Sequence, residues 1–455
     1  MVNQKIFRAY DIRGTYPGEI NEMVGFKIGA ALTRFLKGKL KKKSLKIIIG
    51  RDCRLSSDSL FKAFCRGVFS QQGTVVDIGL VSTDTLYFAI SYLKYDGGAM
   101  ITASHNPKDD NGFKMLAQGQ KFIYQDWGMK EIKKMVNEIK FEKKIFKGKI
   151  IKKNIVPPYV KYVLNLIDLR GIKPLKAVVD AGNGMAGVNI SRIAKEIPVI
   201  LYPMYFEPNG AFPFRNPDPT IKGNIKDCQK MVVKKKADFG LAFDADADRE
   251  VFIDEQGKVL GGDIIIALFS RYFLRKYPGR KIAYNLTCSQ VVEETIKESG
   301  GYPIKTKTGR PFIREEALKN KVIFAGEKSG HLFFSDVFYS ECGGLAFLTM
   351  LKILSETRES LSELVKPFRK YHQLEANLKI NDQSAAIKKI SGFYHQEKKN
   401  RLDGLTIKAK DWRFNVRSSN TEPYLRLVVE SKNKKTAQEK FKQVKKIIKK
   451  FSLNV

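Results

Sequence analysis

"LKIIIGRDCRLSSDSLFKAFCRGVFSQQGTVVDIGL", residues 45–80, decides the fold class of this chain. Two short apolar runs rich in β-branched residues, 45–50 and 74–79, enclose a segment, 58–69, whose apolar residues recur with helical spacing. A strand, a helix and another strand in this order predict a βαβ unit with parallel strands. Because the alternation extends from about residue 20 to about residue 125, we predict a doubly wound α/β domain there.

The alternating pattern recurs twice farther along the chain. A second series runs from "KAVVDAGNG" (176–184) to "ADFGLAFDADAD" (237–248), and a third runs from residue 262 to "KVIFAGEKSGH" (321–331). Open α/β sheets bind ligands at the carboxyl ends of their strands, so three such domains could bring three loops to one cleft. After about residue 369 the pattern changes to strands plus one terminal helix, which predicts a smaller α+β domain.

The predicted fold class is therefore α/β, with three similar doubly wound domains whose sheets are mixed or mostly parallel around a central cleft, plus an α+β C-terminal domain. The tandem prolines in "VPPYV" (156–160) interrupt helix and sheet and give the first boundary. A hairpin-like turn, "DEQGKVLGG" (254–262), gives the second. We expect domains at residues 1–154, 155–255, 256–368 and 369–455.

Composition sets the expected surroundings and partners. The 455 residues contain no apolar stretch of the roughly 18 residues that a membrane span needs, and no signal-peptide pattern, so we expect a cytoplasmic protein without a membrane partner. The five cysteines form no CxxC pair, which argues against disulfides or a zinc site. A monomer and a homodimer both remain open.

The formal net charge of +35 makes a polyanion the first partner to consider. However, the basic runs fall in different predicted elements and form no single arm or repeat. We therefore favour a generally basic surface, which also attracts small phosphorylated substrates, over a nucleic-acid-binding surface. The last basic run is interpreted as the solvated face of an amphipathic helix with an apolar stripe at Phe441, Val444, Ile447 and Phe451.

"FDADADR" (243–249) is the clearest candidate metal site. In extended backbone Asp244, Asp246 and Asp248 project to one side, where their carboxylates repel one another unless a cation lies between them. Hard oxygen ligands favour Mg²⁺. A calcium loop is the rival, since Glu255 occupies its twelfth position, but Arg249 replaces its sixth-position glycine and the flanking segments look like strands.

Two further loops carry hydroxyl and basic residues. In "ITASHNP" (101–107) Ser104 follows an apolar strand at a turn, where serine is usually a local hydrogen-bonding residue, and no G-x-S-x-G elbow surrounds it. In "RSSNTEPYLR" (417–426) hydroxyls, an amide and guanidinium groups suit a phosphate dianion, although a helix N-cap cluster is an alternative. The possible anion ligands there are Arg417, Ser419, Asn420, Thr421 and Arg426.

Five motifs in this order resemble those of the α-D-phosphohexomutases, and within them the phosphomannomutase/phosphoglucomutase group. The motifs are "FRAYDIRG" (7–14), "TASHNP" (102–107), "FDADADR" (243–249), "GEKSGH" (326–331) and "RSSNTEP" (417–423). The resemblance covers essentially the whole chain. It implies a four-domain mutase that interconverts hexose 1-phosphate and hexose 6-phosphate, of mannose or glucose, through a phosphoserine and a bound hexose 1,6-bisphosphate, which also acts as activator.

The resemblance also implies a role for each matching residue. Ser104 would be the phosphorylated serine, and Mg²⁺ would be held by Asp244, Asp246, Asp248 and an oxygen of that serine. Glu327 and Ser329 would read sugar hydroxyls, and Arg417, Ser419, Asn420 and Thr421 would bind the distal phosphate. Further positions that would line the cleft are Tyr10, Arg13, Lys114, Arg249 and His331, of which Arg13, Lys114 and His331 are candidates for proton transfer or charge stabilisation.

The chain departs from the family pattern at three places. Ala245 replaces a glycine, Arg310 replaces a histidine or aromatic residue, and "SECGG" (340–344) replaces an aspartate-rich turn. Asn420 favours mannose or glucose over glucosamine, since phosphoglucosamine mutases tend to carry glycine there. Two alternatives remain: a phosphoglucosamine mutase, and a catalytically inactive nucleic-acid-binding protein on the same scaffold.

Overall fold

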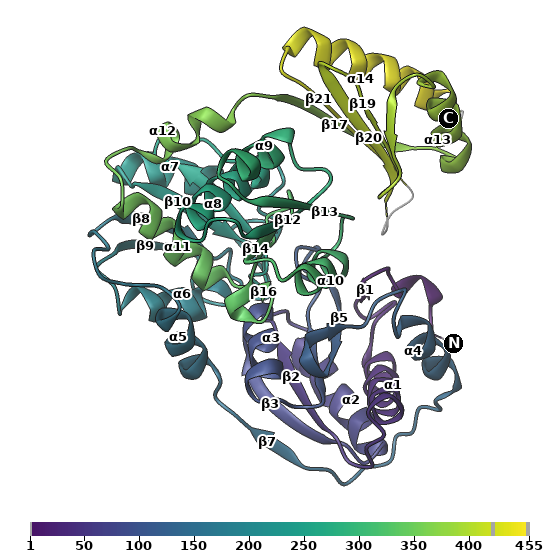
Figure 1. Ribbon diagram of the computed structural model, residues 1–455. Coiled ribbons are helices and arrows are strands. Elements are labelled where there is room, and N and C mark those ends of the chain that lie inside the picture. Colours follow the sequence, from purple (N-terminus) through teal and green to yellow (C-terminus); the bar gives the residue numbers. More distant parts are fainter. Residues whose placement is uncertain (1, 420–423, 452–455) are drawn as a thin grey trace. The chain divides into compact units, whose positions relative to one another are not determined.

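The computed structural model describes residues 2–419 and 424–451 and contains two compact units (Figure 1). The first unit comprises the chain up to Leu260 together with Ser329–Ser362. The second comprises Gly261–Lys328 and the chain from Glu363 onward. Each unit is built from two groups of helices and strands, which are described in turn.

The first sheet has the strand order β1-β5-β4-β2-β3-β7, with β6 paired to β5. Strands β4, β2, β3 and β7 run parallel, whereas β5 is antiparallel to both of its neighbours β1 and β4. The predicted strand-helix-strand alternation at 45–80 is confirmed. The elements are η1 (Gln4–Ile6), β1 (Ile12–Thr15), α1 (Glu22–Leu40), β2 (Lys46–Arg51), α2 (Ser57–Ser70), β3 (Thr74–Leu80), α3 (Thr83–Tyr92), β4 (Gly97–Ile101), β5 (Asp110–Ala117), η2 (Gln118–Gln120), β6 (Lys121–Phe122), α4 (Met129–Glu138) and β7 (Ile150–Lys152).

The second sheet, also in the first unit, has the order β11-β10-β8-β9, in which only β11 is antiparallel. Its strand β10 leads directly into the aspartate loop. The elements are α5 (Val156–Asn165), β8 (Lys176–Asp180), α6 (Ala186–Ala194), β9 (Ile200–Met204), α7 (Lys226–Lys235), β10 (Phe239–Phe243) and β11 (Glu250–Asp254). The first unit also contains β15 (Leu332–Phe334), η3 (Ser335–Val337), β16 (Ser340–Glu341) and α11 (Gly343–Ser355).

The sequence suggested that the tandem prolines at 157 and 158 interrupt helix and sheet. In the structure they instead lie in the first turn of helix α5. The first amide groups of a helix have no carbonyl partner within it, so proline loses no hydrogen bond there. The turn at 254–262 matches its predicted hairpin character, because Asp254 N donates to Lys258 O at 2.9 Å and Leu260 N donates to Phe252 O at 2.8 Å.

In the second unit, strands β13, β12 and β14 run parallel, and three helices alternate with them along the chain. Their bounds are α8 (Gly262–Lys276), β12 (Lys281–Asn285), α9 (Gln290–Glu298), β13 (Tyr302–Thr306), α10 (Arg310–Asn320) and β14 (Phe324–Gly326). After α11 the chain forms the short α12 (Leu361–Val365), which is followed by η4 (Lys366–Phe368).

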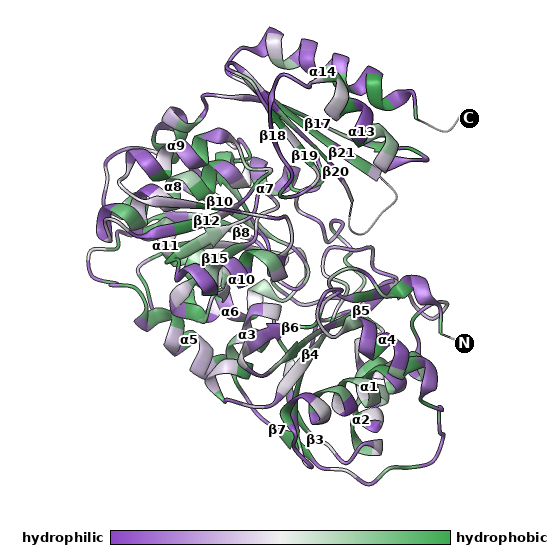
Figure 2. Cartoon of the chain, turned by 45° about the vertical axis from the view of Figure 1, so that its right-hand side comes forward, coloured by the Kyte–Doolittle hydropathy of each residue, from purple (hydrophilic) through white to green (hydrophobic). Residues whose placement is uncertain are grey.

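The C-terminal part of the second unit is an antiparallel sheet in the order β17-β21-β20-β19-β18. Its apolar face packs against α13 and α14, and the stripe predicted for the terminal helix is confirmed by buried Val444 beside half-buried Phe441, Ile447 and Phe451. In Figure 2, α14 accordingly alternates between purple and green. The elements are β17 (His372–Lys379), α13 (Gln383–Phe393), β18 (Lys398–Asn400), β19 (Leu405–Lys408), β20 (Trp412–Ser418), β21 (Tyr424–Ser431) and α14 (Lys434–Lys449).

The expectation of only one helix in this part was wrong, because α13 is present as well. Its sequence signal is Asp382, whose side chain caps the helix by accepting from Ala385 N at 2.8 Å, followed by the buried Ala386 and Ile390 at helical spacing. No helix within residues 2–419 and 424–451 is long and apolar enough to cross a membrane.

Candidate active site

Ser104 lies three residues beyond the end of β4, at the strand-to-loop corner that the sequence predicted. Its backbone has φ 53°, a left-handed conformation that is uncommon for residues other than glycine and that turns the chain sharply. The residue is 1% exposed, and its Oγ donates to Asp244 Oδ2 at 2.9 Å. The serine of the first sheet therefore contacts the aspartate loop of the second sheet directly.

The loop that carries Ser104 is held by Arg54, which the sequence reasoning did not single out. The buried Arg54 guanidinium donates to the carbonyl oxygens of Ser104 and Asn106, both at 2.7 Å, and pairs with Asp52 at 3.1 Å. Arg13 donates to Ala103 O at 3.0 Å and to the Asn106 side chain at 2.8 Å. Two arginines thus fix the backbone on both sides of the serine, which supports its strained conformation.

His105 is a second residue that the sequence reasoning left without a role. Its Nδ1 lies 3.1 Å from Ser104 Oγ. Burial, followed by the positive charges of Arg249 and Arg13, holds the pKa of His105 well below its ordinary value. The imidazole is therefore neutral at physiological pH, and because the hydroxyl hydrogen of Ser104 goes to Asp244, His105 Nδ1 can donate to Ser104 Oγ in the tautomer that carries hydrogen on Nδ1.

The aspartate loop joins β10 to β11, and all three of its carboxylates are fully buried. The prediction that extended backbone would gather them was wrong, since residues 245–247 form a turn in which Ala247 has φ 58°. The turn also lets Asp248 N donate to Asp244 Oδ1 at 3.1 Å. Ala245, where the family pattern has glycine, is not at positive φ, so alanine fits without strain.

Lys114 and Thr83 bind the aspartates from the first sheet and α3. The Lys114 ammonium donates to Asp246 Oδ2 and Asp248 Oδ2, both at 2.5 Å, and the Thr83 hydroxyl donates to Asp246 Oδ2 at 2.5 Å. Lys114 was predicted from the sequence, whereas Thr83 was not, because a threonine at the start of a helix normally indicates only a local cap.

The three carboxylates suit a divalent cation. Asp244, Asp246 and Asp248 each offer an oxygen atom, and these atoms lie within 4.8 Å of one another. Burial, followed by the charges of Asp246 and Asp248, holds the pKa of Asp244 well above its ordinary value. Asp246 Oδ1 is buried without a hydrogen-bond partner among the described residues. Oxygen ligands in this number and of this hardness fit Mg²⁺.

The calcium-loop alternative does not fit the structure. The aspartate loop is flanked by strands β10 and β11 instead of helices. Glu255, which would have been the twelfth-position ligand, accepts hydrogen bonds from Ser362 N at 3.0 Å and from the Ser362 hydroxyl at 2.5 Å.

His331 approaches the aspartate loop from its far side. Its Nδ1 lies 2.6 Å from Asp248 O and 3.5 Å from Glu341 Oε1. Glu341, which is buried, belongs to the "SECGG" turn that departs from the family pattern. The turn therefore still supplies a carboxylate beside the histidine. Arg249 is half-buried, and its backbone N–H donates to Asp244 Oδ1 at 3.3 Å.

Behind Thr83, the buried Asp84 joins three helices. Its carboxylate accepts from the Tyr159 hydroxyl of α5 at 2.5 Å and from Gly343 N at the start of α11 at 3.2 Å. Burial raises the pKa of Asp84 to about 6, against the hydrogen bonds from Ser82 and Tyr159 that lower it.

Asp84 should make the stability of the protein depend on pH between about 4 and 6. The folded protein binds a proton at Asp84 that the unfolded chain, with its pKa of 3.8, has already released in this range, so stability falls as pH rises. A shift from 3.8 to about 6 corresponds to roughly 3 kcal/mol. Asp84→Asn lacks the stabilisation that comes from protonating Asp84. The difference between its urea midpoint and that of the parent should therefore shift in favour of the variant as the pH rises from 4 to 7. A constant difference between the two midpoints would contradict the assignment.

The remaining predicted residues are placed as follows. Tyr10 is half-buried in the bend before β1, and Ser329 is also half-buried. In the second unit, the buried Glu327 accepts from Gly309 N at 2.7 Å through Oε1. Arg310, the residue that departs from the family pattern, is 7% exposed and begins α10 directly after Gly309.

The predicted phosphate loop joins β20 to β21, so the helix N-cap alternative is wrong for its described residues. Arg417 is 6% exposed, and Arg417 and Arg426 face each other as cross-strand partners. Arg417 Nε lies 3.9 Å from Asp403 Oδ2. Two arginines at opposite positions of neighbouring strands suit the several oxygens of a phosphate, which favours the interpretation as an anion site. Ser419 N donates to Tyr424 O at 2.8 Å. Asn420 and Thr421 lie outside the described residues.

Comparisons with known proteins agree with this organisation. Four models of the phosphoglucomutase/phosphomannomutase family match the chain: alpha/beta/alpha domain I at residues 4–143, domain II at 157–257, domain III at 261–371, and the C-terminal domain at 375–447. The phosphomannomutases of Vibrio cholerae and Methanocaldococcus jannaschii are each 35% identical to it, over 98% and 99% of this chain and 99% of each relative.

Solved structures show the same relationship. A phosphoglucomutase/phosphomannomutase family protein from Burkholderia thailandensis has a TM-score of 0.91 and 29% identity over 100% of this chain and 99% of its own. The phosphoglucomutase pp63/parafusin from Paramecium shares the fold, with a TM-score of 0.80 and 18% identity over 99% of this chain and 97% of its own. The chain belongs to the phosphoglucomutase/phosphomannomutase family and is a mutase, an intramolecular phosphotransferase.

Proposed function

We propose that this mutase interconverts hexose 1-phosphate and hexose 6-phosphate of mannose or glucose, with Ser104 as the group that carries the phosphoryl unit. The observation that carries the proposal is the buried contact between Ser104 Oγ and Asp244, within a loop whose three carboxylates can hold Mg²⁺. The names of the 35% identical relatives support mannose phosphate as a substrate. A mutase of amino-sugar phosphates is less well supported, because the N-acetylphosphoglucosamine mutases among the structural neighbours are only 12–14% identical to this chain.

The reaction proceeds in two transfers. A sugar hydroxyl forms a bond to the phosphorus of phosphorylated Ser104 while the bond to Ser104 Oγ breaks, which gives a hexose 1,6-bisphosphate and a free serine. The bisphosphate reorients, and Ser104 Oγ then takes the other phosphoryl group. In each transfer the attacking hydroxyl loses its proton and the leaving oxygen gains one, so no further reactant is consumed.

The side chains around Ser104 have distinct tasks in this proposal. Asp244, Asp246 and Asp248 would hold Mg²⁺, which neutralises charge on the phosphoryl oxygens when bound. Lys114 supplies a fixed positive charge next to the same carboxylates. His331, Arg13 and Lys114 are the candidates for proton transfer, while Arg249 and Tyr10 contact substrate.

Two further groups of residues have proposed roles in substrate binding. Glu327 and Ser329 read sugar hydroxyls. Arg417, Ser419, Asn420, Thr421 and Arg426 bind the phosphate that is not being transferred. Because the sugar must turn round between the two transfers, this phosphate site has to accept either end of the molecule.

The test is a coupled assay with Mg²⁺ and a trace of hexose 1,6-bisphosphate, comparing glucose 1-phosphate and mannose 1-phosphate. Turnover of at least one of them is expected, with a similar kcat/KM for both if the enzyme serves both sugars. Turnover of glucosamine phosphate alone would overturn the proposed substrate class. The alternative of an inactive nucleic-acid-binding protein is less well supported, because the serine and the three carboxylates proposed for catalysis are all present and close together.

Arg417→Ala should raise KM more than it lowers kcat, because this arginine touches a phosphate that does not react. Each charge-assisted hydrogen bond contributes about 1.5 to 3 kcal/mol, so the loss of two corresponds to a KM increase of roughly 100-fold or more. The measurement is initial rate against hexose 1-phosphate concentration. The matched control is Arg170→Ala, whose guanidinium is 91% exposed and should leave both constants unchanged. An unaltered KM in Arg417→Ala would remove this residue from the phosphate site.

A further inference from the structure

The C-terminal sheet has one apolar and one polar face. Its apolar face packs against α13 and α14. On the other face, cross-strand partners of β17, β21 and β20 form successive rows, because residues opposite each other on neighbouring strands share a face. The three rows are Gln373–Glu430–Arg413, Glu375–Val428–Asn415 and Asn377–Arg426–Arg417. The third row holds the two arginines proposed to bind phosphate.

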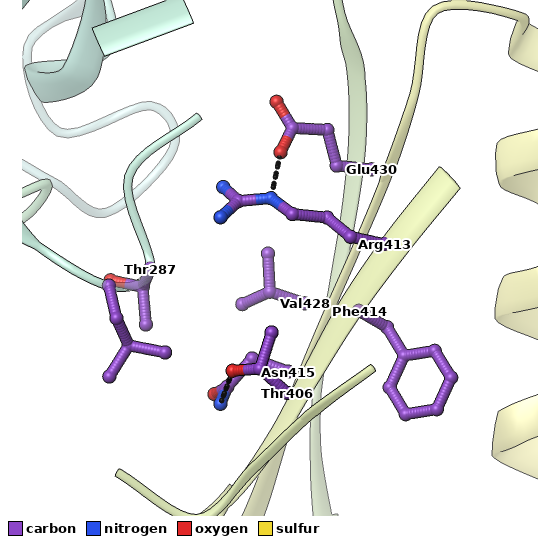
Figure 3. Close-up of a pocket in the computed structure, with 8 residues that line it drawn as sticks. Thr287, Thr406, Arg413, Phe414, Asn415, Val428 and Glu430 are labelled. Atoms are coloured by element: carbon purple, nitrogen blue, oxygen red, sulfur yellow. Dashed lines mark hydrogen bonds and ion pairs between the residues drawn. The ribbon is translucent and has the colours of Figure 1, made fainter. Parts of the chain in front are cut away.

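The first row binds the start of α9. Glu430 accepts from Gln290 N at 3.0 Å and from the Ser289 hydroxyl, so this carboxylate caps the helix N-terminus. Arg413 pairs with Glu430 at 2.5 Å and also donates to Cys288 O. Figure 3 shows this pair beside Thr287, above a small cavity that Asn415 and Thr406 also line. The polar face of the C-terminal sheet is thus docked on the α8–α10 part of the second unit.

The second row is reached by Lys328, the residue directly after Glu327. The Lys328 ammonium donates to the side chains of Gln373 and Glu375, both on β17. Its side chain is 21% exposed. Burial acts to lower the pKa of Lys328, but the carboxylates of Asp263 and Glu375 outweigh it, so the pKa lies above its ordinary value. The side chain of Lys328 therefore links the loop to β17 through Gln373 and Glu375.

The backbone around Lys328 is fixed on the other side. Lys328 N donates to Asn285 Oδ1 at 3.1 Å. A β-carbon added at Gly262 would lie 2.4 Å from Lys328 O, so only glycine permits this close approach. Because Glu327 accepts from Gly309 N, two consecutive residues of the loop are anchored, one to α10 and one to β17.

We propose that Lys328 is a positioning residue that sets the separation between the sugar-reading loop at Glu327 and the phosphate-binding row at Arg417. The inference rests on the proposed function of these two sites. Without the ammonium group, the loop loses its hydrogen bonds to Gln373 and Glu375, and with them its direct side-chain link to β17. A hexose phosphate that must contact both sites then binds less well, whereas a ligand of the phosphate site alone does not.

The test compares Lys328→Met with the parent enzyme in two measurements. The KM for hexose 1-phosphate should rise about three- to five-fold, as expected for loss of a partly exposed ion pair that orients two sites. The inhibition constant of inorganic phosphate, which needs only a phosphate site, should change less than about two-fold. Lys328→Arg should retain a KM near that of the parent. The matched control, Lys319→Met, removes a lysine that is 76% exposed on α10.

A second variant tests the ion pair itself. Adding Glu375→Gln to Lys328→Met removes the carboxylate that has already lost its ammonium partner, so the double variant should have a KM no higher than that of Lys328→Met. An unchanged KM in Lys328→Met, a parallel rise in the phosphate inhibition constant, or additive losses in the double variant would each overturn the inference. If the assignment of the phosphate site itself is wrong, the KM of Arg417→Ala will be unaltered, which is a separate observation from those on Lys328.

Discussion

Ser104→Ala is expected to lower kcat for hexose 1-phosphate on the order of 10⁶-fold, the scale seen when an enzyme loses its nucleophile. The substitution removes only the hydroxyl group. Two threonine hydroxyls identified nearby already have partners: Thr102 Oγ1 accepts from the backbone N–H of residue 104 at 2.8 Å, and Thr83 donates to Asp246. The loop should keep its conformation in the variant, because the two arginines that hold it do not contact the serine hydroxyl. Arg54 and Arg13 bind backbone carbonyls of the loop, and Arg13 also binds the Asn106 side chain.

The measurement is single-turnover and steady-state kinetics with hexose 1-phosphate, with and without added bisphosphate. Ser384→Ala, on the exposed side of α13, is the matched control and should behave like the parent. Unfolding by urea should show that the Ser104→Ala protein remains folded. A kcat within ten-fold of the parent would mean that another group carries the phosphoryl unit.

Asp246→Asn is expected to lower kcat by about 10³-fold, a typical loss when one element of charge stabilisation is removed from a phosphoryl or acyl transfer site. The substitution keeps the size of the side chain but removes one negative charge from the proposed cation site. It also converts an acceptor from Lys114 and Thr83 into a group that can donate, so both partners lose part of their fixed geometry.

The kinetic dependence on Mg²⁺ concentration checks this prediction. The concentration of Mg²⁺ for half-maximal rate should rise in Asp246→Asn, while Asp227→Asn, on the exposed side of α7, should leave it unchanged. A variant with the parent's rate and the parent's Mg²⁺ requirement would remove Asp246 from the metal site.

The sequence predicted the strands and most helices because the spacing of apolar residues and the length of each apolar run distinguish a strand from a helix. The runs at 45–50, 74–79 and 239–243 are too short and too β-branched or aromatic to be helices, and they are strands. The same approach missed α13, whose helix signal depends on a cap at Asp382 and only a few apolar residues. It also placed the three aspartates in extended backbone, because alternation of Asp and Ala does not reveal the turn at Ala247.

The site residues were predictable only where a motif carried them. Ser104 and the aspartates lie in the quoted motifs, and Lys114 lies in "NGFKM" (111–115), which also matches the family. Arg54, in contrast, lies 50 positions from the serine whose carbonyl it binds. Nothing in "GRDCRLSS" distinguishes that arginine from a surface residue until the sheet brings the ends of β2 and β4 together. Lys328 is a similar case, since its partner Glu375 belongs to a separate sheet.

The mass of the intact protein, followed by fragmentation of the peptide that contains Ser104, tests the central claim most directly. Protein incubated with hexose 1,6-bisphosphate should carry one phosphoryl group, located on Ser104, and should lose it to hexose phosphate at the rate of turnover. Protein that never carries a phosphoryl group at Ser104 yet interconverts the two hexose phosphates at full rate would contradict the account.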